Sequence, residues 1–157
     1  MEFAHFSKDL EQLSFNHFRC ATSLGEFKSC YSQHTLPTDH NSQFSVRITK
    51  GQNFKIGLAL SNAPTEGCFA DHKTGMAFYS AGQLRGAACA QYGVKYGAGD
   101  EVTCFVDTYS RQVSFSVNGV FQGVAFDVPG HRKGFYAAVS CLCKNEEFEV
   151  LLPAAED

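Results

Sequence analysis

The stretch YSRQVSFSVNGVFQGVAF, Tyr109 to Phe126, constrains the fold more tightly than any other part of the chain. Apolar and polar residues alternate from Val113 to Val117, and this period of two places the apolar set on one face of a β-strand. Asn118-Gly119 can both adopt positive φ, as a type I′ turn requires. The apolar residues after the turn supply a return strand, in which Gly123 fits a β-bulge. The pattern predicts a β-hairpin, which is a scaffold element without reactive groups.

Short runs of the same kind recur along the chain, separated by turn residues. They predict strands at residues 13–20, 26–32, 43–50, 54–61, 75–84, 101–107, 135–143 and 147–153. The short turn Gly51–Asn53 joins two of these runs, and we expect residues 43–61 to form a second hairpin. Many short strands at this spacing indicate an all-β sandwich or barrel. The start of the chain differs, because HFSKDLEQL, residues 5–13, fits a short helix capped by Ser7.

Length and composition are those of one globular domain. The chain has 157 residues, of which 44% are hydrophobic and 18% charged. Its formal net charge of −3 argues against nucleic acid or an anionic membrane as a partner, because both favour a basic face. No apolar run is long enough to span a membrane, and the N-terminus lacks the apolar segment of a signal peptide. We therefore expect an intracellular, cytoplasmic protein.

The seven cysteines raise the question of a disulfide framework or a metal site. Their number is odd, their spacing is irregular, and no Cys-x-x-Cys pair occurs. Cys104 lies in phase with Val102 and Val106, as a small core residue would. A zinc site would need four converging Cys or His ligands, and no paired spacing supplies them. We expect reduced structural thiols, no bound metal and no cofactor.

Catalytic motifs are not evident. There is no Gly-x-Ser-x-Gly nucleophile elbow, and the glycines of GVKYGAG lack the Lys-Ser/Thr of a phosphate-binding loop. With seven cysteines and six histidines, a Cys-His pair could arise by chance proximity, so an enzyme using such a pair stays open as an alternative. We expect no enzymatic activity.

Several motifs in a fixed order resemble the SPRY domain family. Along the chain they are KIGLAL, DHKTGMAFYSAG, YGAGDEVTCFVD, RQVSFSVNGVFQGVAF, GFYAAVSC and FEVLLP. The best individual matches are Gly99-Asp100, Asp107, Phe115, Asn118-Gly119, Gly123 and residues 136–140. The similarity extends from Phe44 to Pro153. The family's usual tryptophans are missing and Ala137 replaces its common proline, so the chain resembles a divergent member.

The resemblance implies an all-β fold, a bent sandwich of two antiparallel sheets of the concanavalin-like kind, without catalytic activity. It implies a single domain over residues 1–157, with an N-terminal extension and first strands at 1–40 and the best-matching core at 41–153. SPRY domains are protein-interaction modules, so the implied partner is a protein or short peptide bound by loops at one edge of the sandwich. The chain would be a monomer that serves as the substrate-recognition part of a ubiquitin-ligase adaptor or another scaffold. The alternative is a carbohydrate-binding, lectin-like module, since lectins share the sandwich.

The resemblance to the SPRY domains of SOCS-box adaptors also implies a binding site. In those relatives a Val-Trp-Gly stretch lines a peptide pocket, and the residues aligned with it here are Val139, Ser140 and Cys141. We expect Val139 to lie at an edge of the sandwich and to contact the partner. The other pocket residues come from two loops, here Tyr31 to Ser42 and Asn62 to Gly67. Within these loops the candidate partner-binding residues are Tyr31, Gln33, Asn62 and Thr65.

Overall fold

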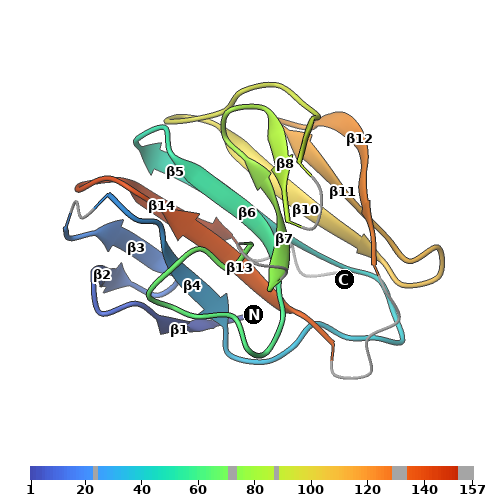
Figure 1. The fold of residues 1–157 in the computed structure, drawn as a ribbon, viewed down its shortest axis with the longest axis horizontal. Helices are drawn as coiled ribbons and strands as arrows, with labels where there is room; N and C mark the ends of the chain where they lie inside the picture. Colours follow the sequence, from blue (N-terminus) through green and yellow to red (C-terminus); the bar gives the residue numbers. More distant parts are fainter. Residues whose placement is uncertain (23–24, 71–73, 87–88, 129–133, 152–157) are drawn as a thin grey trace, which may run out of the picture.

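The structure is a computed structural model that describes residues 1–22, 25–70, 74–86, 89–128 and 134–151. Over these residues it is an all-β sandwich of two antiparallel seven-stranded sheets (Figure 1). Both the predicted fold class and the number of sheets are therefore confirmed. The part of the chain that the structure describes contains no helix, and so none that could cross a membrane.

The chain passes repeatedly from one sheet to the other. The first sheet contains, in spatial order, β1 (Phe3–Phe6), β4 (Lys28–Ser32), β13 (Tyr136–Cys141), β6 (Phe54–Ala59), β7 (Gly75–Tyr79), β8 (Gln83–Arg85) and β9 (Ala90–Gln91). The second contains β12 (Val120–Asp127), β11 (Gln112–Val117), β10 (Glu101–Asp107), β5 (Ser42–Lys50), β14 (Glu147–Leu151), β3 (His17–Cys20) and β2 (Leu10–Ser14). Strands distant in sequence thus become neighbours at the centre of each sheet.

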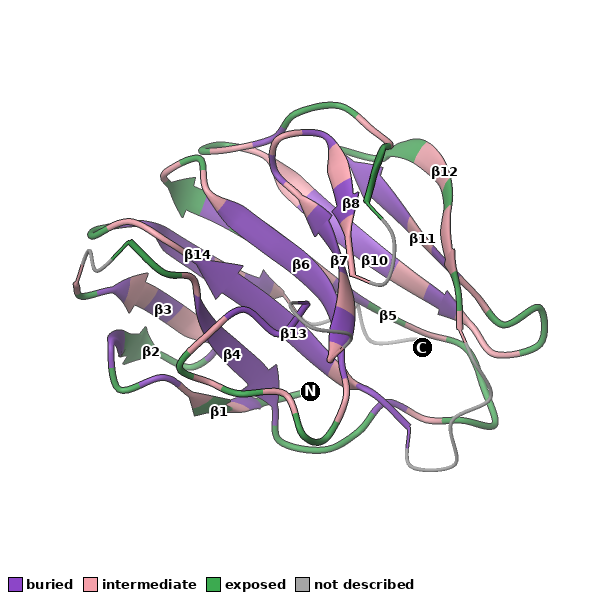
Figure 2. Cartoon of the chain, viewed as in Figure 1, coloured by how far each residue is buried: buried purple, intermediate pink, exposed green. Residues whose placement is uncertain are grey.

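The core lies between the sheets and is built largely from phenylalanine. The Phe78 ring of the first sheet meets the Phe115 ring of the second at 5.3 Å between centroids, and Phe54 meets Phe148 at 6.3 Å. All four side chains are fully buried. Figure 2 shows that buried residues concentrate on the central strands, whereas the edge strand β12 is largely exposed. Buried phenylalanines thus serve as the large core residues of a chain that has no tryptophan.

The predicted hairpin at 109–126 is present as β11 and β12. Asn118 and Gly119 have φ of 51° and 80°, as the type I′ turn requires. A register shift between β11 and β12 accommodates an extra residue near Gly123, whose φ is 101°. The apolar residues of the return strand are more exposed than the hairpin pattern suggested, with Val120, Phe121 and Val124 at 64%, 62% and 52% exposed. Phe121 pairs with Ser116 on the outer face of an edge strand, where no second layer covers it.

The predicted N-terminal helix at residues 5–13 is wrong. The chain instead forms strand β1, a turn and strand β2. Ser7 does act locally, but it stabilises the turn: its hydroxyl accepts a hydrogen bond from Asp9 N at 3.0 Å, and its carbonyl accepts one from Leu10 N at 3.0 Å. Pairing of β1 with β4 and of β2 with β3 supplies the backbone hydrogen bonds that a helix would have made internally. Tertiary pairing therefore outweighs a weak local helix signal.

The predicted hairpin at residues 43–61 is also wrong, because β5 and β6 belong to different sheets. The turn between them is bound by the buried carboxylate of Glu146, which accepts hydrogen bonds from Gln52 N at 3.0 Å and Asn53 N at 2.8 Å. The same side chain accepts hydrogen bonds from Leu142 N and Cys143 N. Glu146 thus joins two turns at one end of the sandwich, where the chain passes from one sheet to the other.

Candidate functional site

Of the two loops predicted to form the binding site, the one after β6 packs on the outer face of the first sheet, where Cys68 and Phe69 join a buried cluster with Tyr31. The loop after β6 folds back across this face, as the segment between β6 and β7 shows in Figure 1. The Tyr31 hydroxyl of β4 donates a hydrogen bond of 2.5 Å to the Pro64 carbonyl, and the Tyr31 ring meets that of Phe69 at 6.3 Å. Burial raises the pKa of Tyr31, so the phenol stays protonated and able to donate. Because Tyr31 is only 6% exposed, it positions the loop from below.

The far side of this loop is held by Glu66. Its carboxylate accepts hydrogen bonds from the Ser7 hydroxyl at 2.8 Å and from Lys8 N at 3.0 Å, and it lies 3.7 Å from the Lys28 ammonium. Desolvation opposes ionisation, but the hydrogen bonds from Lys8 and Ser7 and the charge of Lys28 lower the pKa of Glu66 below its ordinary value. Thr65, one of the predicted site residues, accepts a backbone hydrogen bond from Ser29 N at 2.9 Å. The loop is therefore fixed along its length.

Exposed side chains lie on this loop and beside it. Gln33, Asn62 and Pro64 are exposed, and so is His5, whose ring meets the half-buried Tyr136 edge-on at 6.4 Å. His5 Nε2 lies 3.2 Å from the Gln33 carbonyl oxygen, which joins strand β1 to the start of the loop at 33–41. We call this area the loop surface: residues 33–41 and 60–67 together with His5 and Tyr136. It combines exposed polar side chains with a braced backbone.

The three residues aligned with the Val-Trp-Gly stretch do not face solvent. Val139, Ser140 and Cys141 are each 0% exposed, and β13 is an interior strand between β4 and β6. The expectation that Val139 lies at an edge is therefore wrong. Val139 and Cys141 belong to the core between the sheets, and Ser140 lies beneath the 60–70 segment with its hydroxyl 2.8 Å from that of Ser29. Their position lets them support the loop surface from within.

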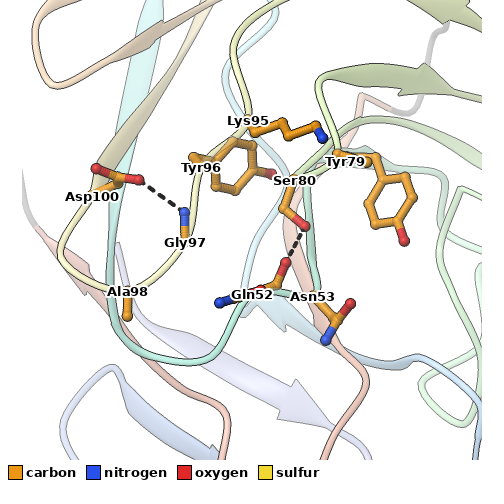
Figure 3. A pocket seen from close by; sticks show the side chains of 10 residues that line it. Gln52, Asn53, Tyr79, Ser80, Lys95, Tyr96, Gly97, Ala98 and Asp100 are labelled. Atoms are coloured by element: carbon orange, nitrogen blue, oxygen red, sulfur yellow. Dashed lines mark hydrogen bonds between the residues drawn. The ribbon is translucent and has the colours of Figure 1, made fainter.

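Sequence reasoning missed a pocket at the other end of strand β6. It is lined by residues 52–53, 79–81, 95–98 and Asp100, and its volume is about 480 Å³ (Figure 3). We call it the turn pocket, because the turns after β5 and β7 and the segment before β10 form its walls. The glycines and polar residues of these segments signalled turns in the sequence. Nothing local indicated that the three turns would meet.

Most of the thiols are core residues. All seven cysteines are free, and five of them are buried. Burial raises the pKa of Cys30 and of Cys104, so both remain protonated near neutral pH. A hydrogen bond from the Cys141 thiol lowers the pKa of Cys20 from 9.0 to about 7, but both side chains are 0% exposed. Among the described residues, no group of three or more His, Cys, Asp or Glu side chains could hold a metal ion.

Comparison with solved structures supports the architecture described above. A crystal structure of a human SPRY domain matches with a TM-score of 0.80 and 22% identity, covering 95% of this chain and 98% of that one. The SPRY domain of human HERC1 matches with a TM-score of 0.74 and 15% identity, covering 90% of this chain and 91% of that one. At these identities the likeness shows a shared fold.

Comparison by sequence gives the family. A curated relative, the ATP-dependent RNA helicase DDX1 of Xenopus laevis, is 36% identical over 58 residues, which are 37% of this chain and 8% of the helicase. The chain thus spans only a small part of that relative's length. The SPRY domain family model matches residues 41–155, most of the sequence, and SPRY domains are in general protein-interaction modules. With motifs, sandwich and family model in agreement, the chain belongs to the SPRY domain family.

Proposed function

We propose that this domain binds a protein or a short peptide through the loop surface and has no catalytic role of its own. One observation supports the proposal: the hydrogen bond from Tyr31 on β4 to the Pro64 carbonyl holds the 60–67 loop on the outer face of the first sheet, and the loop at 33–41 begins directly after the same strand. Gln33 and Asn62 project from this braced backbone into solvent, where they can contact a partner. A preformed surface binds with a smaller loss of conformational entropy than a loop that must first become ordered.

The partner we infer is a protein rather than nucleic acid or a membrane, which the formal net charge of −3 supports. In this proposal Tyr31 and Thr65 hold the loop, and Gln33 and Asn62 make direct contact. Val139, Ser140 and Cys141 act from beneath, by fixing the strand against which the loop lies. We further propose that the domain works as a monomer inside the cell, as the recognition part of a larger assembly such as a ubiquitin-ligase adaptor. The short matching span within DDX1 is compatible with a module that occurs inside longer proteins.

The proposal is tested by selection of a ligand followed by substitution. A phage-displayed library of random peptides is selected on the folded domain, and the affinity of the enriched peptide is measured by calorimetry. Gln33→Ala and Asn62→Ala together should weaken binding by about tenfold or more, because truncation of central contact residues typically has that effect. Melting temperature should change by no more than about 2 °C, since surface substitutions alter stability little.

The matched control is Gln12→Ala, an exposed glutamine on β2 at the edge of the other sheet, which should leave the affinity unchanged. The proposal fails if Gln33→Ala and Asn62→Ala bind the selected peptide normally while other surface changes abolish binding. Changes in the VPGHRKG segment, Val128 to Gly134, provide that comparison, although residues 129–133 lie outside the described part of the chain.

A further inference from the structure

The turn pocket is large enough for a ligand group and lies apart from the loop surface. Its volume of about 480 Å³ falls within the range of small-ligand sites. Strand β6 begins beside the pocket at Phe54 and ends beside the loop surface at Ala59, so the two areas are separated by the length of a strand. A ligand in the pocket therefore makes contacts independent of those proposed for the loops.

Hydrogen bonds across the walls make this pocket rigid. The Ser80 hydroxyl donates to the Gln52 carbonyl at 2.6 Å and accepts from Phe54 N at 3.0 Å, which ties the β5–β6 turn to the β7–β8 turn. The buried Tyr96 hydroxyl donates to the Phe78 carbonyl at 2.5 Å. Ala98 N donates to the Gly51 carbonyl at 2.9 Å and closes the remaining wall. The pocket is thus preformed, and little ordering is needed on binding.

Positive charge gathers around the Tyr79 side of the pocket. The Arg85 guanidinium lies 5.2 Å from the Tyr79 ring centroid, and the Lys55 ammonium lies 5.3 Å from it. Figure 3 shows the exposed Lys95 side chain along the rim with its ammonium directed toward Tyr79. Within the described ranges, no carboxylate lies within 4.0 Å of the Lys95 ammonium or the Arg85 guanidinium. The Arg85 guanidinium donates hydrogen bonds to the Leu84 carbonyl and to Gln83 Oε1, whereas the exposed Lys95 ammonium can pair with an external anion.

The acidic residue of the lining lies away from these cations (Figure 3). Asp100 stands on the wall opposite Tyr79, as Figure 3 shows. One of its carboxylate oxygens accepts from Gly97 N at 2.9 Å, and the other accepts from the Asn118 amide at 2.8 Å. Both oxygens are thus occupied by donors of neighbouring turns. The Asp100 carboxylate keeps its charge but is hydrogen-bonded on one wall of the pocket, and the cations and the Tyr79 ring lie on the opposite wall.

We propose that the turn pocket binds a carboxylate side chain of an acidic peptide segment of the partner. Lys95 forms the ion pair at the rim, and the Tyr79 ring, held between cations, contacts the aliphatic stem of the acidic residue. Arg85, at 5.2 Å from the ring centroid, contributes positive potential. The inference rests on the protein partner proposed for the loop surface. That partner would then contact the domain at two places, through the polar loops and through an acidic side chain in the turn pocket.

The test is an amide chemical-shift titration by NMR with two defined probes, acetyl-(Gly-Glu)₃-amide and acetyl-(Gly-Gln)₃-amide. The glutamate peptide should shift the amides of residues 79–81 and 95–97, and its affinity should fall as salt rises. Lys95→Gln should weaken binding by about fivefold, the scale of one exposed ion pair. Lys8→Gln, which removes the same charge from an exposed lysine in the N-terminal turn, should leave the affinity unchanged.

Three results would overturn the proposal. The first is that the glutamine peptide binds as tightly as the glutamate peptide. The second is that Lys8→Gln weakens binding as much as Lys95→Gln, which would indicate a response to the net charge of the domain alone. Inorganic phosphate could produce the same shifts with equal affinity, which would make the site one for free anions rather than for a peptide. Failure here leaves the loop surface untouched, because Gln33→Ala and Asn62→Ala test that surface with a different ligand.

Discussion

At the scale of single residues, the position of a side chain in the fold decides its contribution to stability more than its residue type does. Phe115 and Phe121 lie six residues apart on the two arms of one hairpin, yet Phe115 is 0% exposed and Phe121 is 62% exposed. Phe115 faces the other sheet and meets Phe78 and Tyr92. Phe121 lies on the outer face of an edge strand. The same residue type thus belongs to the core in one case and to the surface in the other.

Phe115→Ala should therefore lower the free energy of unfolding by about 3–5 kcal/mol, through lost burial and the cavity left behind. Phe121→Ala is the matched control and should cost less than about 1 kcal/mol, because that ring is already in contact with water. Urea unfolding followed by tyrosine fluorescence measures both. Equal losses for the two variants would contradict the burial assigned to these residues.

The turn residue Gly119 tests backbone conformation rather than packing. Its φ is 80°, and a Cβ added there would meet no heavy atom within 4 Å. Any loss caused by Gly119→Val must accordingly come from forcing a β-branched residue into the left-handed region, at about 1–3 kcal/mol. Gly119→Asn should be far milder, because Asn tolerates that region. If thermal melting shows the two variants to be equally stable, the turn is not of type I′.

At the scale of elements, the loop at 60–67 behaves as part of the sandwich because its two ends and its middle are held. Tyr31 holds Pro64 from the sheet, and Glu66 joins the loop to the N-terminal turn through Ser7, Lys8 and Lys28. The Lys28 side chain is itself only 8% exposed and also lies 3.4 Å from Asp9. An electrostatic network thus fixes the position of a loop that composition alone marks as irregular.

This network should give the loop a pH dependence of defined sign. The pKa of Glu66 is lowered in the folded state, so its ionised form adds stability above its ordinary pKa of 4.5, and this contribution is lost as pH falls through the lowered value. Glu66→Gln should therefore cost stability at pH 7 and progressively less toward pH 3. The side chain is 44% exposed, so the effect at pH 7 should stay below about 1 kcal/mol.

Urea unfolding of Glu66→Gln and wild type at both pH values measures this difference. Glu2→Gln, at another exposed glutamate near the N-terminus, serves as the control and should show no such dependence. A destabilisation by Glu66→Gln that stays constant or grows toward pH 3 would contradict the assigned network.

At the scale of the whole molecule, the sandwich is held by packing and strand pairing, without covalent links between cysteines. Five of the seven free thiols are buried as small apolar groups, with Cys20, Cys30, Cys104 and Cys141 in the core between the sheets. Both sheets contribute residues to this core, and these residues are drawn from nearly the whole sequence, from Phe3 to Val150. Stability is consequently distributed over the fold and should respond little to redox conditions.

The melting temperature should change by less than about 2 °C when strong reductant or chelator is added. A disulfide typically contributes about 2–4 kcal/mol, and for a domain of this size its loss would lower the melting temperature by several degrees. Differential scanning calorimetry with and without each reagent makes the comparison. A large drop with reductant would reveal a disulfide, and one with chelator would reveal a structural metal.

The sequence by itself determined the features that depend on neighbouring residues. Alternation predicted the β11–β12 hairpin, Asn118-Gly119 predicted its turn, and the order of the motifs along the chain indicated the SPRY family. It also placed the two loops of the candidate surface, although it could not rank their residues by exposure. These properties are local because a period of two and a positive φ are set within a few residues.

Only the tertiary structure decided which strands pair and which side chains face solvent. Residues 5–13 became two strands because β4 and β3 offered backbone partners. Strands β5 and β6 lie in different sheets because β5 pairs with β10 and β14, whereas β6 pairs with β13 and β7. Val139 was expected at an edge and lies in the core, because β4 and β6 flank its strand. The turn pocket likewise depends on three turns brought together by the sheets. Each of these outcomes depends on contacts between segments that are distant in sequence. A local sequence pattern carries no information about the energies of such contacts.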